Sequence, residues 1–202
     1  MKIFCIGRNY AAHALELQNE VPDSPIIFMK PSTAILHKDR DFYIPDFSNN
    51  IHYEGEIVLK IGKNGKAIDP KFASKYISQI TVGIDFTARD LQDELKKKGH
   101  PWEIAKAFDG AAVIGEWSEA SDFDFKNIGF QLHKNGECVQ DGNTSLLLFP
   151  FEQLISHISK YFTLQTGDLI YTGTPAGVAK VTAGDYLEGF LEGRRVMECN
   201  VK

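Results

Sequence analysis

The most constraining feature of this sequence is the stretch Ile51–Leu59, in which two glutamates alternate with large apolar residues. Side chains of a β-strand point alternately to opposite faces, so His52, Glu54 and Glu56 are expected to share one face. The apolar side chains of the stretch would occupy the other face. We therefore predict a single strand that continues to Ile61 and has one polar and one apolar face.

The two glutamates of this strand are close enough to act on a common ligand. The Cβ atoms of Glu54 and Glu56 would be about 7 Å apart, two strand rises, so their carboxylates can converge. Two carboxylates about 5 Å apart repel by roughly 3 kcal/mol at an effective dielectric near 20. A solvated face tolerates this repulsion, whereas a cleft requires a proton, a basic partner or a cation. Oxygen ligands suit Mg²⁺, Ca²⁺ or Mn²⁺. The stretch alone leaves a solvated face and a metal site equally open.

A third carboxylate occurs in an apolar setting further along the chain. The segment Ile80–Phe86 is expected to be a buried strand with Asp85 near its end. Acidic residues at the start of the following helix are explained by the positive end of the helix dipole. That explanation does not apply to Asp85. With Glu54 and Glu56, it would complete a three-carboxylate cation site that leaves positions for water and substrate.

The bulk properties limit the classes of protein to consider. A chain of 202 residues is within the size of one domain, and we expect residues 1–202 to form a single one. The net charge of −5 argues against a nucleic-acid partner. Three cysteines without a CxxC spacing are typical of reduced thiols. No stretch has the length of a signal peptide or a membrane span. We therefore predict a soluble, cytoplasmic enzyme or binding domain.

Short strands separated by turn residues make up most of the remaining chain. We expect strands at 3–6, 26–29, 42–44, 111–117, 169–172, 186–191 and 194–201, with hairpin turns at Asn64-Gly65 and Asn135-Gly136. Helices are expected at 10–19, 71–77, 88–98 and 150–162, the third with Thr87 as its N-cap. The regular βαβ alternation of a doubly wound fold is missing. The pattern predicts a strand-rich α+β fold.

A second group of residues suits acid–base chemistry. His13 and Glu16 lie three residues apart in the first expected helix and can form a hydrogen bond. Glu16 would orient the imidazole, and His13 would act as general base for a water molecule. An exposed pair without a role is the alternative. Lys30 and Lys106 are equally compatible with surface positions. The glycine-rich segment 172–177 offers N–H groups to an anion but lacks the lysine of a nucleotide-binding loop.

Five motifs occur in a fixed order: Gly7-Arg8-Asn9-Tyr10 with His13 and Glu16, Phe28-Met29-Lys30-Pro31, Glu54-x-Glu56, Asp85-x-Thr87-Ala88-Arg89-Asp90-x-Gln92, and Thr172-Gly173-Thr174-Pro175-x-Gly177-Val178. In this order they resemble the fumarylacetoacetate hydrolase family over nearly the whole chain. The resemblance is greatest to its short, single-domain branch, which includes acylpyruvases and the oxaloacetate decarboxylase of animal mitochondria. It implies a mixed β-sandwich roll with a few short helices, usually as a homodimer.

The resemblance also implies roles for individual residues. Glu54, Glu56 and Asp85 would hold Mg²⁺ or Mn²⁺, with Ca²⁺ as a further option, whereas His52 matches no metal motif of the family. The helix at 10–19 would be a mobile lid.

The catalytic and substrate-binding residues follow from the same resemblance. His13, Glu16 and Lys106 would be catalytic. Substrate contacts would come from Arg8, Lys30, Arg89, Gln92, Gly173 and Thr174.

This residue set suits a 2,4-dioxo acid of the acylpyruvate type. Hydroxide formed by His13 would attack the distal carbonyl, and cleavage of the C–C bond would leave a pyruvate enolate, with the cation as Lewis acid and template. Lys30, Lys106 and Gln92 would stabilise the oxyanion. Decarboxylation of oxaloacetate would give the same enolate without water, and isomerisation or decarboxylation of a dienedioate is a third possibility. A non-catalytic metal-binding protein is the alternative of a different class.

Overall fold

The computed structural model describes residues 1–18 and 20–202. Its strands are β1 (Ile3–Gly7), β2 (Ile26–Lys30), β3 (Ile51–Tyr53), β4 (Gly55–Ile61), β5 (Ile77–Asp85), β6 (Thr87–Ala88), β7 (Ala112–Ile114), β8 (Ser118–Glu119), β9 (Gly129–Lys134), β10 (Glu137–Asn143), β11 (Leu169–Tyr171), β12 (Ala179–Lys180), β13 (Tyr186–Leu191) and β14 (Arg194–Asn200). Its α-helices are α1 (Ala11–Glu16), α2 (Pro70–Ala73), α3 (Arg89–Lys98), α4 (Glu103–Lys106) and α5 (Phe151–Tyr161). The strand-rich α+β class predicted from the sequence is confirmed.

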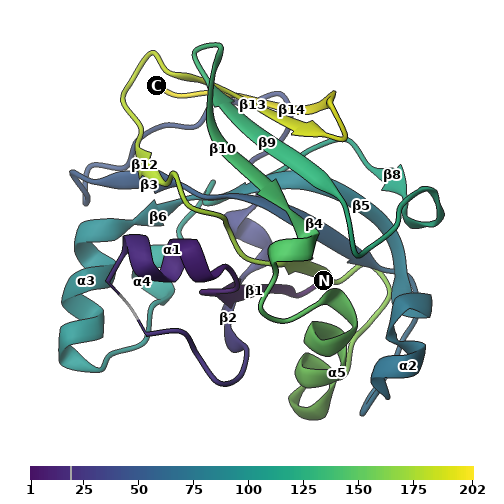
Figure 1. Ribbon diagram of the computed structural model, residues 1–202. Coiled ribbons are helices and arrows are strands. Elements are labelled where there is room, and N and C mark those ends of the chain that lie inside the picture. Colours follow the sequence, from purple (N-terminus) through teal and green to yellow (C-terminus); the bar gives the residue numbers. More distant parts are fainter. Residues whose placement is uncertain (19) are drawn as a thin grey trace.

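The strands form three sheets. The central sheet has the order β2-β1-β11-β4-β5-β7, with β8 also paired to β5. A four-stranded sheet, β10-β9-β13-β14, lies across one face of it and contacts β4 and β5 (Figure 1). The third sheet is β12-β3-β6. In Figure 1, α1, α3 and α4 gather at one end of the central sheet, while α2 and α5 lie at the other.

Both faces of the central sheet are covered by apolar side chains. In β1, Phe4 and Ile6 belong to the large core, whereas Ile3 and Cys5 belong to a smaller cluster on the opposite face. This division follows the two-residue period of a strand. It explains why the sequence of β1 is continuously apolar rather than alternating.

The stretch that was predicted to be one strand is divided between two sheets. Residues Ile51–Tyr53 pair with β12 and β6, whereas the chain from Gly55 onward pairs with β11 and β5. The prediction of an uninterrupted strand was therefore wrong. Glu54 lies at the change of sheet, and its carbonyl oxygen accepts a 2.9 Å hydrogen bond from the Asp85 N–H. The break thus places the end of β5 directly beside the two glutamates.

Of the two hairpin turns predicted at Asn-Gly sequences, one is present in the structure and the other is not. Asn135 and Gly136 both have positive φ, 54° and 84°, and join β9 to β10 as predicted for a type I′ hairpin. The hairpin predicted at Asn64-Gly65 was wrong, because the chain passes through α2 before β5 pairs with β4. The Asn64 side chain instead accepts a 2.8 Å hydrogen bond from the N–H of Thr166, 102 residues away.

Three smaller predictions also require correction. Segment 42–44 forms no strand; Phe42 makes an isolated bridge to Val201. Thr87 belongs to β6 and does not cap α3, whose N-cap position is Ala88 and has no side-chain hydrogen bond. The first helix, expected at 10–19, is α1 and ends at Glu16. The last residue of that expected range lies outside the described residues.

The start of α1 is fixed to the core by Asn9. Its buried side chain donates to the carbonyl oxygens of Phe149 at 3.1 Å and Thr172 at 2.8 Å, and accepts from the Phe149 N–H at 2.8 Å. These bonds determine where α1 begins and place it over the break between β3 and β4. Among the residues that the structure describes, no helix is long and apolar enough to cross a membrane.

Candidate active site

Three carboxylates converge where β3, β4 and β5 meet. Oxygen atoms of Glu54, Glu56 and Asp85 all lie within 4.8 Å of one another. The three residues are only 5, 2 and 1% exposed. A solvated strand face is therefore excluded for these glutamates. Buried carboxylates at this separation require compensating positive charge.

Three basic side chains surround the carboxylates. The Lys106 ammonium, from α4, lies 2.7 Å from Glu54 and 2.8 Å from Asp85. Arg89, the first residue of α3, forms an ion pair with Glu54. Lys30, at the end of β2, lies 2.7 Å from Asp85 and donates to the carbonyl oxygen of Lys106. Both lysines are buried, so the surface positions that the sequence left open are excluded.

These charges determine the protonation of the cluster. Burial raises the pKa of Glu54, but Lys106 and Arg89 outweigh it and hold the pKa well below its usual value. Burial, Asp85 and Glu54 together hold the pKa of Glu56 well above its usual value. Burial lowers the pKa of Lys106, but Asp85 and Glu54 outweigh it and raise the pKa overall. Lys106 is therefore cationic at neutral pH.

The donor set fits a hard divalent cation. All candidate ligand atoms are carboxylate oxygens, the ligands preferred by Mg²⁺, Mn²⁺ and Ca²⁺. Oδ1 of Asp85 lies 2.7 Å from the Lys30 ammonium, which also donates to the Lys106 carbonyl oxygen. A carboxylate oxygen keeps lone pairs beyond the one used by a single lysine contact, so all three carboxylates can still supply ligand atoms.

Gly173 and Thr174, which follow β11, form hydrogen bonds that hold the segment of the two glutamates. The Gly173 N–H donates to Oε2 of Glu56 at 2.7 Å. Gly173 has a φ of 100°, and a Cβ atom there would lie 2.6 Å from Cβ of Asn9. Only glycine fits this conformation and this approach. The side chain of Thr174 donates to the Gly55 carbonyl oxygen at 2.9 Å.

Gln140 holds this arrangement together, and sequence reasoning missed it. From β10, its amide donates to the Thr174 hydroxyl at 2.8 Å and to the Pro175 carbonyl oxygen at 3.0 Å. Its Oε1 accepts a 2.8 Å hydrogen bond from the Gly55 N–H, between the two glutamates. No local pattern marks this glutamine, because its role comes entirely from contacts distant in sequence.

The predicted acid–base pair lies above the carboxylates. Nδ1 of His13 is 3.2 Å from Oε2 of Glu16, whose other oxygen accepts a 2.9 Å hydrogen bond from the Gly177 N–H. His13 is buried, which excludes the exposed pair without contacts that the sequence left open. Burial lowers the pKa of His13, so the imidazole is neutral at pH 7. Glu16 occupies Nδ1, which leaves Nε2 free for a water molecule.

A cavity of about 30 Å³ joins these groups. It is lined by most of the residues that the sequence singled out: Arg8, His13, Glu54, Glu56, Arg89, Gln92, Lys106 and Thr174. Lys30, Asp85 and Gly173 do not line it but contact residues that do, Lys106 in the first two cases and Glu56 in the third. The wall also contains Phe28, from the second motif, and residues that the sequence did not single out: Ile6, Leu17, Lys96 and Trp102. This volume accommodates about one water molecule.

His52, on the same predicted face as the glutamates, is not part of this group. Its Nε2 lies 3.0 Å from Oδ1 of Asn50, and it does not belong to the carboxylate cluster. Burial and the nearby Arg89 lower the pKa of His52 to about 4.

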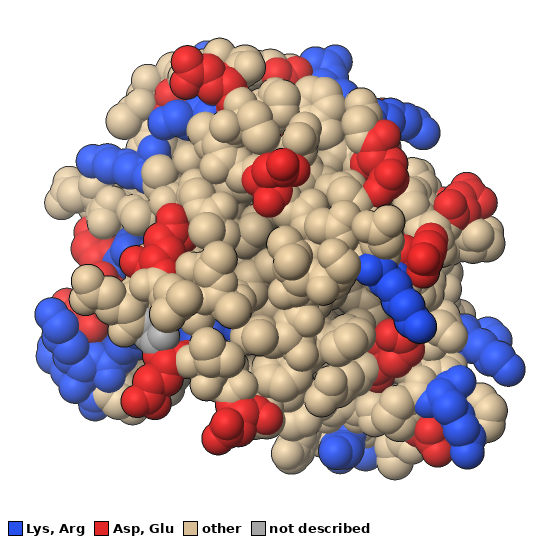
Figure 2. All heavy atoms as spheres, viewed as in Figure 1, with Lys and Arg blue, Asp and Glu red and all other residues tan. Residues whose placement is uncertain are grey.

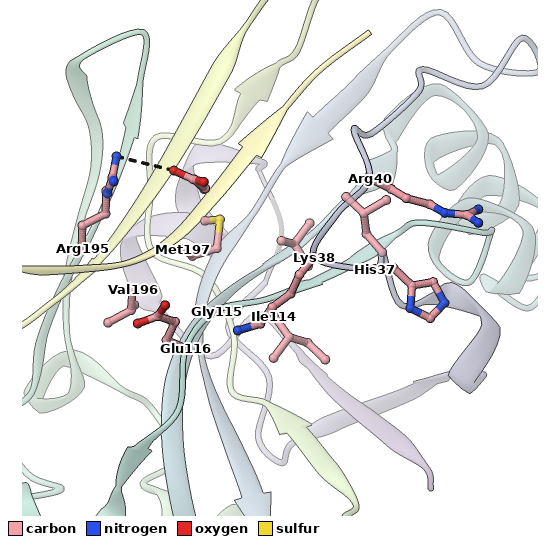
Figure 3. Close-up of a pocket in the computed structure, with 12 residues that line it drawn as sticks. His37, Lys38, Arg40, Ile114, Gly115, Glu116, Arg195, Val196 and Met197 are labelled. Atoms are coloured by element: carbon pink, nitrogen blue, oxygen red, sulfur yellow. Dashed lines mark ion pairs between the residues drawn. The ribbon is translucent and has the colours of Figure 1, made fainter.

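A larger cavity elsewhere holds none of these groups. It measures about 230 Å³ and lies between the loop at 36–40, β7 and β14 (Figure 3). Its Arg195 is already paired with Glu198, at 3.6 Å, and with Glu188, at 2.8 Å. We therefore choose the candidate active site by the convergence of buried titratable groups and not by cavity volume.

The chain belongs to the fumarylacetoacetate hydrolase family. The model of the fumarylacetoacetate hydrolase C-terminal domain matches residues 2–202. The mitochondrial oxaloacetate tautomerase of Bos taurus is 38% identical over 201 residues, which are 99% of this chain and 91% of the relative.

Two solved structures extend this result. The fumarylpyruvate hydrolase of Pseudomonas aeruginosa, in complex with Mn²⁺ and pyruvate, superposes with a TM-score of 0.94 at 35% identity, covering 100% of this chain and 89% of that one. A 5-carboxymethyl-2-hydroxymuconate delta-isomerase from Mycobacterium smegmatis gives a TM-score of 0.86 at 35% identity, covering 99% and 78%. The family resemblance inferred from the five motifs is confirmed.

Replacing Gln140 by alanine tests its supporting role. Loss of the side chain leaves the Gly55 N–H buried without an acceptor, which costs about 1–3 kcal/mol. We expect the free energy of unfolding in urea to fall by that amount. Gln131→Ala, in the partner strand of the same hairpin, is the control: among the described residues this side chain forms hydrogen bonds only with Asp141 and His133 and supports no buried backbone group, so the substitution should change the free energy by less than about 0.5 kcal/mol. Equal effects of the two substitutions would contradict the assignment.

Replacing Glu56 by glutamine tests the cation site. Glutamine keeps an acceptor for the Gly173 N–H but removes a negative ligand, so the protein should fold and lose cation affinity. Saturating Mn²⁺ at about 100 times its Kd should stabilise the wild type by about 2.7 kcal/mol. Thermal unfolding with and without Mn²⁺ should show this increase for the wild type and for the exposed-site control Glu116→Gln, but not for Glu56→Gln. An equal increase in all three proteins would exclude the cluster as the binding site.

Proposed function

We propose that this protein is a divalent-metal-dependent hydrolase that cleaves a C–C bond in 2,4-dioxo acids of the acylpyruvate type. The observation that carries the proposal is a buried three-carboxylate cluster on the same cavity as His13, whose neutral imidazole is oriented by Glu16. A cation site alone would serve many proteins. A positioned base next to it is the arrangement required for metal-assisted attack by water.

Two groups of residues would act on the substrate: the carboxylates through a bound cation, and His13 as a base for water. Glu54, Glu56 and Asp85 would hold a divalent cation, Mg²⁺ or Mn²⁺ with Ca²⁺ as a further option, which supplies a Lewis acid for charge that develops on the 2-oxo oxygen. His13 takes a proton from water at Nε2, while Glu16 keeps Nδ1 protonated and stabilises the imidazolium that forms. The hydroxide attacks the distal carbonyl carbon.

The basic residues stabilise the charge that follows. Lys106 and Gln92 line the cavity and can donate to the oxyanion, and Lys30 supports Lys106 through its carbonyl oxygen. Collapse of the oxyanion breaks the C–C bond and releases a carboxylic acid. The remaining pyruvate enolate takes up a proton, which His13 carries as imidazolium. The Pseudomonas relative, whose structure contains Mn²⁺ and pyruvate, supports this reading.

A second candidate uses the same cavity without attack by water. The bovine relative is named an oxaloacetate tautomerase, and decarboxylation of oxaloacetate also produces a pyruvate enolate. Isomerisation of a dienedioate is a related use, since one of the solved relatives is a delta-isomerase. These reactions need a proton transfer but no hydroxide. A non-catalytic metal-binding protein remains the alternative of another class.

A single domain over residues 1–202, a mobile α1, a homodimer and a cytoplasmic location stay predictions. The bovine relative is mitochondrial, so its name does not support the cytoplasmic location. Sedimentation of the purified protein tests the dimer directly.

Pyruvate release from acetylpyruvate tests the hydrolase. The wild type should release pyruvate with Mg²⁺ or Mn²⁺ and lose this activity in EDTA. His13→Ala should lower kcat by about 100- to 10,000-fold, the usual contribution of a general base. His157→Ala, a histidine substitution on α5 far from the cavity in sequence and fold, should behave as the wild type.

The outcomes separate the candidate functions. Unchanged acetylpyruvate turnover in His13→Ala would refute the proposed base. Oxaloacetate turnover that survives His13→Ala, with no turnover of acetylpyruvate by the wild type, would favour decarboxylation. Failure to turn over either compound with any metal would favour the non-catalytic alternative.

The pH dependence provides a separate test of the His13–Glu16 pair. Since only neutral His13 is a base, kcat/KM should fall as the pH drops through its pKa, which burial places below 6.5. Glu16 raises the pKa of His13 through its hydrogen bond and charge. Glu16→Gln should therefore move the acidic limb to still lower pH as well as reduce kcat. A limb that stays in place would show that another group titrates.

A further inference from the structure

His52 and Arg89 are neighbours in the three-stranded sheet beside the carboxylate cluster. In the antiparallel pairing of β3 with β6, His52 lies opposite Thr87, and the Arg89 N–H donates a 2.9 Å hydrogen bond to the Asn50 carbonyl oxygen. Residues opposite each other, and residues two apart on one strand, project from the same face of a sheet. His52 and Arg89 are therefore diagonal neighbours, about 7 Å apart and within reach of aromatic and long side chains.

Arg89 differs from most of the basic residues of its helix. Basic side chains are concentrated at the lower left of Figure 2, where α3 lies in Figure 1, whereas Arg89 is buried. Its Nη1 donates to Oε1 of Gln92 at 2.6 Å, and its Nη2 forms the ion pair with Glu54. Within residues 1–18 and 20–202, its buried Nε–H has no acceptor. A buried N–H of this kind needs a partner, which can be an ordered water molecule.

The imidazole of His52 has the complementary requirement. Its Nε2 lies 3.0 Å from Oδ1 of Asn50, an atom that can only accept, so Nε2 carries the proton of the ring. Since burial and the nearby Arg89 lower the pKa of His52 to about 4, the ring is neutral at pH 7 and Nδ1 is left as an acceptor. Among the described residues, this buried Nδ1 has no donor. One face of the sheet thus holds a donor without an acceptor beside an acceptor without a donor.

We propose that His52 is a positioning residue for Arg89, with Nδ1 accepting the hydrogen bond of the Arg89 Nε–H through one bridging water molecule. No direct hydrogen bond joins the two atoms in the described part of the chain, so a water molecule between them donates to Nδ1 and accepts from Nε–H. The guanidinium is then held at all three of its nitrogens, by Glu54, Gln92 and His52.

The orientation of this guanidinium matters because Arg89 lines the inner cavity. The inference rests on the proposed function for the contact between Arg89 and the substrate, whereas the hydrogen bond to His52 does not depend on it. It also gives a role to a histidine that lies two residues before Glu54 and is not part of the carboxylate cluster.

The tautomer of His52 tests the link without any substrate. A long-range proton–nitrogen correlation spectrum of protein labelled with nitrogen-15 in its histidines distinguishes a protonated from an unprotonated ring nitrogen. At pH 7 we expect the proton on Nε2 and an unprotonated, hydrogen-bonded Nδ1. The signals of His52 are identified as those that His52→Asn removes. A proton on Nδ1 overturns the proposal, because a protonated Nδ1 cannot accept.

Two amide substitutions test the position of the acceptor. Asparagine places its amide oxygen near the position of Nδ1, whereas glutamine reaches that of Nε2. We expect His52→Gln to raise KM for acetylpyruvate with Mn²⁺ by about 10-fold, as expected for a buried donor left unpaired. The same variant should change kcat by less than about 3-fold, because attack by water depends on His13. His52→Asn should keep KM close to that of the wild type, as should His100→Asn, which replaces an exposed histidine just after α3.

Equilibrium binding separates failure of this link from failure of the proposed reaction. Calorimetric titration of the Mn²⁺-loaded protein with pyruvate requires no turnover. Binding that is about 10-fold weaker in His52→Gln but unchanged in His52→Asn supports the positioning role even where acetylpyruvate is inert. Equal affinity of the two variants, whether unchanged or reduced together, overturns it.

Discussion

The pairing of two buried carboxylates, Glu54 and Asp85, with three buried cations, beside a third carboxylate whose pKa is raised, is the constraint on which the site depends. One uncompensated charge in this position would cost several kcal/mol. The acids come from the ends of β3, β4 and β5, while the cations come from β2, α3 and α4. Six elements must therefore meet within a few ångströms. The change of sheet at Glu54 allows this, because it places the end of β5 directly beside the glutamates.

The segment from Gly173 to Gly177 connects this charge cluster to the acid–base pair. At one end the Gly173 N–H holds Glu56, and at the other the Gly177 N–H holds Glu16, which in turn orients His13. Both glycines have φ near 100°, outside the range favoured by other residues. One short loop thus sets the relative position of the proposed cation ligands and the proposed base. Its dimensions are fixed by backbone groups, which are less variable in position than long side chains.

How far the sequence predicts the structure depends on the range of the interactions involved. The Asn135-Gly136 turn was predicted correctly because both residues act within the turn itself. Asn64-Gly65 has the same local sequence, but here both residues form hydrogen bonds to a segment about 100 residues away, and no hairpin forms. Strand alternation correctly predicted that Glu54 and Glu56 lie together, although the strand is broken at Glu54. The role of Gln140 could not be predicted, since all three of its side-chain hydrogen bonds join segments far apart in sequence.

The fold does not by itself distinguish among the reactions of the family. Relatives named as a hydrolase and as an isomerase superpose on this chain with TM-scores of 0.94 and 0.86. What differs among substrates must be recognised at the cavity wall, and the face of α3 is suited to this. Arg89 and Lys96 are seven residues apart, about 10 Å along the helix axis. Arg89 pairs with Glu54, whereas Lys96 lies one helical stretch further out and lines both the inner cavity and its outer neighbour. Differences between substrates of different length would therefore be felt along this face of α3.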